Sequence, residues 1–346
     1  MRWPLHLLLV LPLLAPAHAG AEPTRLRVSL QLPITGHLGV NLLQFKKEVE
    51  ARSDGGITLE IFDNSQLYKD NEAVGAVASG AVEMATVTYQ QFTRPVPAIG
   101  IFEQPFLFNF EALTRAALAP ESEMRQILDK AILDVTGVRV LWWMSYGGSV
   151  LFSKAKDARH PRELHERKVR VFGDNMMSFT KYCGGTPLLI SASKQQQALK
   201  DGTVDFVMTG ITGVDGRKLW EVSDTVTRTE HAALEFIVIV NEKVWQSLGP
   251  KGQSIVLEAS KRAERDLREQ MAGIEAKAYD FARSKSMKIH ELTPNEVYEW
   301  RACSAPLLDD FMKQAGEMGA VLMAAYGRLR QQPCCSAGPT GTFSLR

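Results

Sequence analysis

Apolar positions in the first third of the chain change repeatedly between strand-like and helix-like spacing. Residues 26–30 and 57–62 alternate apolar with polar side chains, as half-buried strands do. Between them, residues 38–49 repeat apolar side chains at helical spacing. A short helix over residues 72–79 and a strand within residues 81–89 are predicted next. This β-α-β-α-β order is typical of a parallel sheet whose strands are joined by helices.

A second block of predicted strands and helices begins near residue 138. Strands are expected at residues 138–143, 149–154, 168–172, 186–190 and 204–209, and a long β-rich run covers residues 231–240. Residues 249 to about 286 predict one helix of roughly 35 residues, about 50 Å long. A helix of that length should run across both blocks.

The two blocks predict two α/β lobes. Lobe I is expected to contain residues 22–143 and 235–270, and lobe II residues 144–234 and 271–330. The chain should cross between the lobes near residues 143–146 and 232–236, and a hinge is expected there because hinges fall at the ends of elements. Residues 331–346 are rich in Pro, Gly and Ser, which predicts a disordered tail.

The N-terminus has the pattern of a secretory signal peptide. Arg2 precedes a short apolar run, and Ala17-His18-Ala19 forms a small-residue cleavage site. The run is shorter than the roughly 20 residues that span a bilayer. Residues 1–19 are therefore predicted to be removed after about Ala19, which exports the mature chain to the periplasm. No later segment is long and apolar enough to predict membrane insertion of that mature chain.

Composition excludes some partners. The 346 residues are 45% hydrophobic, enough for two domains with cores of their own. The formal net charge is +1, from 40 basic and 39 acidic residues. This balance does not indicate nucleic-acid binding or a polybasic membrane surface.

Known catalytic patterns are missing from the sequence. It contains no GxSxG, HExxH, P-loop or GxGxxG motif, and its scattered histidines lack metal-ligand spacing. The cysteines, at positions 183, 303, 334 and 335, have no zinc-site spacing; one disulfide could form among them, and the sequence does not pair them. An enzyme, a metal site and a cofactor are therefore not predicted.

The position of Arg170 indicates that its side chain has a binding partner. It lies in the alternating segment "KVRVF", residues 168–172, where Val169 and Val171 face one side and Arg170 the other. Ligands of open α/β sheets bind beyond the carboxyl ends of the strands, and a guanidinium fits a carboxylate with two hydrogen bonds. A structural ion pair with an acidic side chain of the protein is an equally good interpretation.

Five segments, in order, resemble one known family. They are "GGITLEIFDNSQL", "SGAVEMATVT", "FEQPFLFNFEAL", "HPRELHERKVRV" and "ALKDGTVDFV", within a match from about residue 26 to residue 328. Together they resemble the extracytoplasmic solute-binding proteins of tripartite ATP-independent periplasmic (TRAP) transporters, of the dicarboxylate-binding-protein (DctP) type.

The resemblance implies a fold and a function. The fold is α/β, a two-lobed periplasmic-binding-protein architecture with mixed or parallel sheets, a hinge between the lobes and a long helix bracing both. Such proteins catalyse nothing; they bind a small organic acid in the interlobe cleft and deliver it to membrane permease subunits. The family's ligand arginine falls on Arg170. A periplasmic ligand-sensing subunit of a signalling system and a secreted hydrolase remain as alternatives.

The resemblance also directs attention to further site residues. Besides Arg170, the candidates for ligand binding are Tyr89, Gln90, Tyr146, Phe172, Thr209, Thr212, Trp220, Glu235 and Phe236. Many family members carry a second arginine where this chain has Val150, which favours a monocarboxylate with an apolar or aromatic body. Glu235 could hold a cation beside the ligand, or pair with Arg170 in the empty cleft.

Overall fold

The computed structural model describes residues 23–108 and 110–336. The predicted signal peptide therefore lies outside the described residues. The strands are β1 (Thr24–Ser29), β2 (Ile57–Phe62), β3 (Met84–Thr88), β4 (Val138–Ser153), β5 (Lys168–Val171), β6 (Thr186–Leu189), β7 (Phe206–Gly210), β8 (Thr225–Arg228), β9 (Ala233–Asn241) and β10 (Lys288–Glu291).

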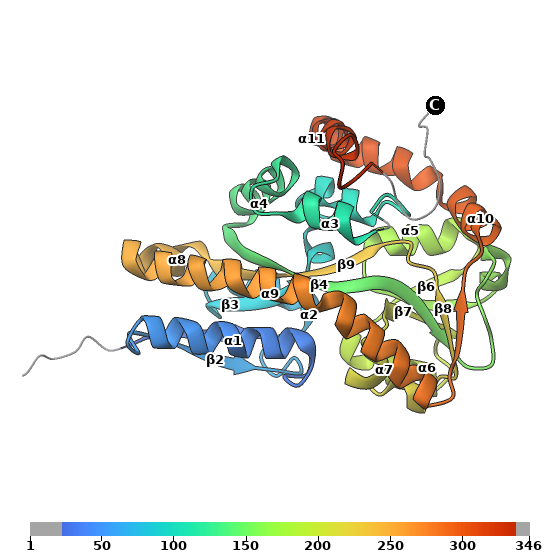
Figure 1. Cartoon of the computed structure of the whole chain (residues 1–346), viewed down its shortest axis with the longest axis horizontal. Helices are drawn as coiled ribbons and strands as arrows, with labels where there is room; N and C mark the ends of the chain where they lie inside the picture. The colour runs from blue at the N-terminus through green and yellow to red at the C-terminus, as the bar shows by residue number, and fades with distance from the viewer. Residues whose placement is uncertain (1–22, 109, 337–346) are drawn as a thin grey trace, which may run out of the picture.

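Helices connect and cover these strands (Figure 1). The α-helices are α1 (His37–Arg52), α2 (Asp70–Ser79), α3 (Glu111–Leu118), α4 (Glu123–Thr136), α5 (Asp174–Tyr182), α6 (Gln195–Lys200), α7 (Gly213–Gly216), α8 (Glu242–Ser247), α9 (Gly249–Ser284), α10 (Pro294–Ser304) and α11 (Pro306–Arg330). The 3₁₀ turns are η1 (Tyr89–Phe92), η2 (Pro97–Glu103), η3 (Pro161–Leu164), η4 (Ala192–Lys194) and η5 (Leu219–Glu221).

The strands lie in the order β2-β1-β3-β9-β4-β7-β5-β6, with β8 and β10 joined to β4. Strands β1, β2 and β3 pair in parallel, as do β5, β6 and β7, while β9 is antiparallel to β3 and β4. The fold is thus a mixed α/β fold with two lobes. Below, lobe I denotes β1 to β3, β9, the first part of β4 and their helices. Lobe II denotes the last part of β4, β5 to β8 and their helices.

Strand β4 belongs to both lobes. The sequence predicted two strands in this region, but β4 is continuous over 16 residues. Residues 138–148 pair with β9, and residues 149–153 pair with β7. The second crossing lies where β8 ends and β9 begins at Ala233. The proposed lobe boundaries at residues 143/144 and 234/235 stay a prediction, as does the hinge motion.

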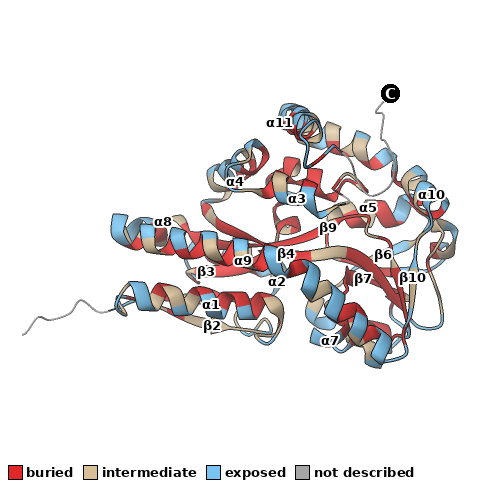
Figure 2. Ribbon diagram, viewed as in Figure 1, coloured by how far each residue is buried: buried red, intermediate tan, exposed pale blue. Residues whose placement is uncertain are grey.

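Helix α9 braces both lobes, and its predicted length is confirmed at 36 residues. Its first half buries Val256, Ala259, Ala263 and Leu267 against the lobe I core. Its second half buries Ala278, Tyr279 and Ala282 against the lobe II core. Figure 2 shows the buried stripe of α9 alternating with exposed positions, as expected for an amphipathic helix.

The C-terminal elements return across the molecule. Helix α11 contacts η2 of lobe I, and Tyr326 donates a hydrogen bond to the carbonyl of Leu107 at 3.2 Å. Residues 331–336 form turns, and Cys335 is fully buried in the lobe I core. The disordered tail predicted for residues 331–346 stays a prediction, and residues 337–346 lie outside the described residues.

The four cysteines, which the sequence did not pair, form two disulfides. Cys183, directly after α5, is bonded to Cys303 of α10, across 120 residues of sequence, and Cys334 is bonded to Cys335. The first bond ties the C-terminal helices to lobe II. Within the part of the chain that the structure describes, no helix has the length and apolar character needed to span a bilayer.

Candidate functional site

Arg170 is buried near the end of β5, between two neighbouring strands. It pairs with Leu188 of β6 and Val207 of β7, and its side chain is 2% exposed. The guanidinium is oriented by two backbone carbonyls: Nε donates to Ile190 at 2.7 Å, and one terminal nitrogen donates to Met208 at 2.8 Å. No carboxylate of residues 23–108 or 110–336 lies within 4.0 Å of it. The interpretation of Arg170 as half of a structural ion pair is therefore wrong.

A cavity of about 30 Å³ lies in front of Arg170. Its lining comes from both lobes: Gln31, Asp70, Thr88, Gln90, Leu234, Glu235 and Phe236 from lobe I, and Tyr146, Arg170, Phe172, Ala192, Thr209 and Arg217 from β4 and lobe II. Several of these residues lie at or just beyond the carboxyl ends of β1, β3, β5 and β7. This is the edge at which α/β sheets bind their ligands.

Arg217 is a second guanidinium in the same cavity, and sequence reasoning missed it. It follows the four-residue helix α7, and it donates hydrogen bonds to the Tyr146 hydroxyl and, at 2.9 Å, to Oγ1 of Thr209. Its Nε is buried without a hydrogen-bond partner. Burial first, and then the charge of Arg217, lower the pKa of Arg170 to about 9, while Asp70 acts in the opposite direction. Arg170 therefore still carries its charge at neutral pH.

Neutral polar groups in the cavity lack partners as well. Both amide atoms of Gln31, both amide atoms of Gln90 and the hydroxyl of Thr88 are buried without a hydrogen bond. Buried polar atoms are paired in more than about 90% of cases. Such a concentration of unpaired atoms around one cavity is the arrangement expected of a site for a polar ligand.

Seven of the ten predicted site residues line this cavity: Gln90, Tyr146, Arg170, Phe172, Thr209, Glu235 and Phe236. The other three do not line it. Tyr89 begins the 3₁₀ turn η1 and packs in the lobe I core against Phe102 and Trp143. Trp220 packs instead beneath the ammonium group of Lys285, 4.3 Å from the ring centroid.

Thr212 lies in a neighbouring pocket that it shares with His37, Tyr146 and Arg217. Burial and the charge of Arg217 lower the pKa of His37 to about 4, so His37 is neutral at physiological pH. Neither side chain reaches the cavity of Arg170. Gln31, Asp70, Thr88 and Arg217 replace the three misplaced candidates, and the only sequence signal for the first three is their place at or near a predicted strand end or turn.

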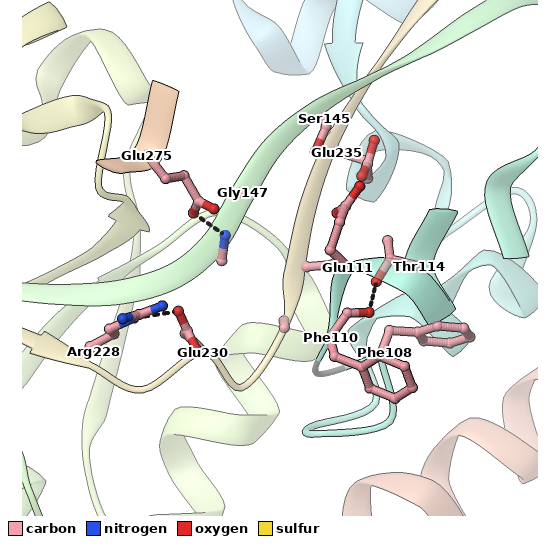
Figure 3. Close-up of a pocket in the computed structure, with 13 residues that line it drawn as sticks. Phe108, Phe110, Glu111, Thr114, Ser145, Gly147, Arg228, Glu230, Glu235 and Glu275 are labelled. Atoms are coloured by element: carbon pink, nitrogen blue, oxygen red, sulfur yellow. Dashed lines mark hydrogen bonds and ion pairs between the residues drawn. The ribbon is translucent and has the colours of Figure 1, made fainter. Parts of the chain in front are cut away.

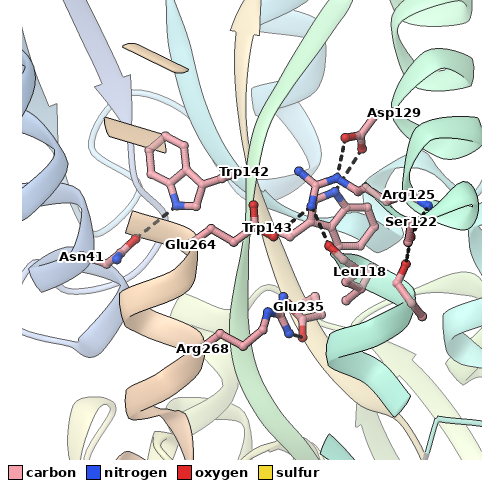
Figure 4. A network of polar contacts seen from close by, with 11 residues as sticks. Asn41, Leu118, Ser122, Arg125, Asp129, Trp142, Trp143, Glu235, Glu264 and Arg268 are labelled. Carbon is pink, nitrogen blue, oxygen red and sulfur yellow. Dashed lines mark hydrogen bonds and ion pairs between the residues drawn. The ribbon is translucent and has the colours of Figure 1, made fainter. Parts of the chain in front are cut away.

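Glu235 is committed to an arginine other than Arg170. Both of its oxygens accept from Arg268 of α9 at 3.1 Å, and both side chains are almost fully buried. Figure 4 shows this pair beside a second buried pair, Arg125 with Glu264 at 2.9 Å. Burial raises the pKa of Glu235, and Arg268 opposes that rise. Glu235 is therefore paired with Arg268 and not with Arg170, and its role beside a cation stays a prediction.

Polar contacts also join the lobes around the cavity. Ser191, which follows β6, donates from its hydroxyl to Asp70 of α2 at 2.9 Å, and Arg94 donates to Asp174 of α5 at 2.7 Å. These contacts join lobe I to lobe II.

A third contact between the lobes involves a fully buried carboxyl group. Asn175 of α5 donates to Glu103 of η2 at 2.7 Å, and the second oxygen of Glu103 is buried without a partner. Burial raises the pKa of Glu103 to about 8. Glu103 is therefore largely protonated at neutral pH in this arrangement.

A second, larger cavity of about 280 Å³ lies nearby and shares Glu235 in its lining (Figure 3). Its charged lining residues are Glu111, Glu230, Glu235, Glu275 and Arg228. Glu230 is paired with Arg228, and Glu275 accepts from the backbone N–H of Gly148 at 3.0 Å. None of the side chains lining this cavity has a buried unpaired polar atom. Its larger volume alone therefore does not identify it as a ligand-binding site.

Two lobes that meet around a cavity lined by the buried guanidinium of Arg170 and the partly buried guanidinium of Arg217 have the arrangement of a two-lobed binding protein for a small anionic solute. Comparison with known families agrees with this class. The family described as "Bacterial extracellular solute-binding protein, family 7" (DctP) matches residues 35–315, so the chain belongs to that family.

Individual relatives match nearly the whole chain. The C4-dicarboxylate-binding periplasmic protein DctP of Rhodobacter capsulatus is 27% identical over 303 residues, covering 86% of this chain and 89% of that protein. A TRAP periplasmic solute-binding protein of Sulfurospirillum deleyianum, solved with bound succinate, is 25% identical with a TM-score of 0.80, covering 89% of this chain and 98% of that one. DctP7 of Bordetella pertussis, which binds pyroglutamic acid, shares the fold at 23% identity and a TM-score of 0.83, covering 88% and 99%.

Proposed function

We propose that this protein is the periplasmic solute-binding subunit of a TRAP transporter and that it binds a small organic acid in the cavity between its lobes. The observation that carries the proposal is the buried guanidinium of Arg170, which is fixed by two carbonyls, faces the cavity and has no carboxylate partner among the described residues. A carboxylate on the ligand supplies the missing charge.

The energetics favour this role for Arg170. A hydrogen bond to a charged group contributes about 1.5–3 kcal/mol, and a buried charge without a partner is costly. The carbonyls of Ile190 and Met208 hold the fork before a ligand arrives, which lowers the entropic cost of binding. Related proteins support the ligand class, since one is named for C4-dicarboxylates and another was solved with succinate.

Export and delivery complete the proposed function. The predicted signal peptide in residues 1–19 places the mature chain in the periplasm, and the membrane permease subunits of a TRAP transporter receive the acid from it. The family and the fold are those of solute-binding receptors, which supports capture without a catalytic step.

A thermal-shift screen of the purified chain from residue 20 onward tests the proposal. A bound acid stabilises the folded protein by mass action, by about 2.7 kcal/mol when its concentration is a hundredfold above Kd. This stabilisation raises the melting temperature. At least one small carboxylate of a broad panel should do so, and NMR of the recovered acid should show it unchanged. A panel in which no carboxylate shifts the transition, or an acid that is converted, contradicts the proposal.

A further inference from the structure

The charges around the cavity add up to one positive charge in excess. Arg170 and Arg217 contribute two guanidiniums, and Asp70 contributes one carboxylate. Glu235 adds nothing to the sum because Arg268 neutralises it. His37, which lies against the ring of Tyr146, is neutral and does not change the balance. A ligand with one net negative charge therefore completes the site, whereas a dianion brings one charge too many.

The two guanidiniums converge on adjacent residues of β7. Arg170 donates to the carbonyl of Met208, and Arg217 donates to the hydroxyl of the next residue, Thr209. The buried Nε of Arg217 has no partner. A single carboxylate placed between the two side chains can accept from both, since its two oxygens offer about four acceptor sites. Arg217 thus supplies, from the segment after α7, the second cation that is missing at Val150.

The lobe I side of the cavity requires groups that both donate and accept. Gln31 and Gln90 each leave an amide nitrogen and an amide oxygen unpaired, and Thr88 leaves a hydroxyl unpaired. A hydrocarbon or aromatic ligand body would bury these atoms against apolar surface, at about 1–3 kcal/mol for each unsatisfied group. Hydroxyl groups satisfy them, because one hydroxyl can donate and accept at once. The apolar or aromatic body expected from the sequence therefore does not fit.

We propose that the ligand is a compact hydroxylated monocarboxylate, with its carboxylate between Arg170 and Arg217 and its hydroxyl groups on Gln31, Thr88 and Gln90. This inference rests on the proposed function and narrows it to one chemical class. Asp70 accepts from Ser191 through one oxygen, and its other oxygen is available for a ligand hydroxyl.

Titration calorimetry with matched acids tests the inference. The pairs are glycerate with propionate and erythronate with butyrate, which have equal carbon numbers and differ in hydroxyl groups, together with succinate and benzoate. The hydroxylated member of each pair should bind at least tenfold more tightly, since each new hydrogen bond contributes about 0.5–1.5 kcal/mol. Succinate and benzoate should bind more weakly than erythronate.

The outcomes separate this inference from the proposed function. Butyrate binding as tightly as erythronate overturns the hydroxyl assignment, and succinate binding more tightly than erythronate overturns the charge balance; in both cases the protein still binds an organic acid. If no acid of the panel or of the broader carboxylate screen binds, the proposed function is contradicted, and so is this inference, which depends on it.

Variants of one strand provide a matched control. Thr88→Val should reduce the preference for erythronate over butyrate about threefold to tenfold, by removing one polar contact. Thr86→Val, on the same strand, also removes a buried unpaired hydroxyl but does not line the cavity, so it should leave the preference unchanged. Equal effects of the two substitutions contradict a contact between Thr88 and the ligand.

Arg217 is tested by separating affinity from preference. Arg217→Met should weaken glycerate and propionate by the same factor, tenfold or more, because both have the carboxylate that Arg217 contacts. Arg217→Lys should recover part of that loss for both acids. Unchanged affinity in Arg217→Met, with a melting temperature like that of the wild type, removes Arg217 from the site.

Discussion

Two cavities share Glu235 in their lining, and they differ in size by almost an order of magnitude, about 30 Å³ against about 280 Å³. In the larger cavity, Glu230 is paired with Arg228 and Glu275 with a backbone amide. In the smaller one, the guanidinium of Arg170 is buried, and the Nε of Arg217, the amide atoms of Gln31 and Gln90 and the hydroxyl of Thr88 are buried without partners.

The difference teaches that unpaired polar groups, more than volume, identify a binding site in this fold. A carboxylate that already has a partner, or that reaches water, gains little from a ligand, because binding would only exchange one contact for another. The buried guanidinium of Arg170 has no carboxylate partner among the described residues, so a ligand carboxylate adds a new contact to it. Four tests can break or sharpen this comparison.

The largest effect is expected from the buried pair that neutralises Glu235. Arg268→Met should cost roughly 3–5 kcal/mol in the free energy of unfolding, since the carboxylate of Glu235 would remain buried without a partner. Urea denaturation measures this cost. Arg265→Met, on the exposed side of the same helix, should stay within about 0.5 kcal/mol. Equal costs for the two variants would show that the Glu235 pair is unimportant to stability.

The next largest effect is on binding. Arg170→Ala should weaken the tightest acid of the screen about tenfold to a hundredfold, which corresponds to 1.5–3 kcal/mol for a charge-assisted contact. Arg228→Ala, which removes the guanidinium of the larger cavity, should change the affinity by less than about twofold. If calorimetry finds the same loss of affinity for both variants, the smaller cavity is not distinguished from the larger one as the binding site.

A third test concerns Glu103, a buried carboxyl group that lacks the arginine that Glu235 has. Its pKa is raised from 4.5 to about 8 by burial, so the folded protein binds a proton that the unfolded chain releases between these values. The stabilising effect of that proton is fully present below about pH 4.5 and is lost as the pH rises through about 8.

Stability should therefore decline from pH 5 to pH 8 in the wild type, and Glu103→Gln should flatten this decline. The variant should be more stable than the wild type at pH 8 by about 1–3 kcal/mol, the cost of a buried group left unsatisfied. Melting temperatures across this pH range measure the effect. Parallel pH profiles for the two proteins would mean that Glu103 does not titrate in this window.

The smallest effect is expected at the rim of the larger cavity. Glu111 is about half exposed and lies 3.5 Å from Arg115. Glu111→Gln should change acid affinity by less than about twofold, because a screened surface pair contributes little. A tenfold change would mean that the larger cavity takes part in binding, and the comparison of the two cavities would have to be reversed.

The predictions from the sequence succeeded where short-range pattern was enough. Residues 249–284 form the long helix predicted for residues 249 to about 286. They failed where a side chain's neighbours decide its role. Tyr89 and Gln90 are adjacent in sequence, yet one is packed in the core and the other lines the cavity, because successive residues point in different directions.

The sequence by itself predicted the α/β periodicity, the family resemblance and Arg170 as a candidate for an external partner. Each of these follows from residue type and local spacing, which a linear pattern preserves. Only the tertiary structure decided that Arg217 joins Arg170, that Arg268 takes Glu235, and that Gln31, Thr88 and Gln90 share one cavity. Arg170 and Arg217 are 47 positions apart in the sequence, Glu235 and Arg268 are 33 apart, and Gln31 and Gln90 are 59 apart. Their partners are chosen by how strands and helices pack in space, and no local pattern records that choice.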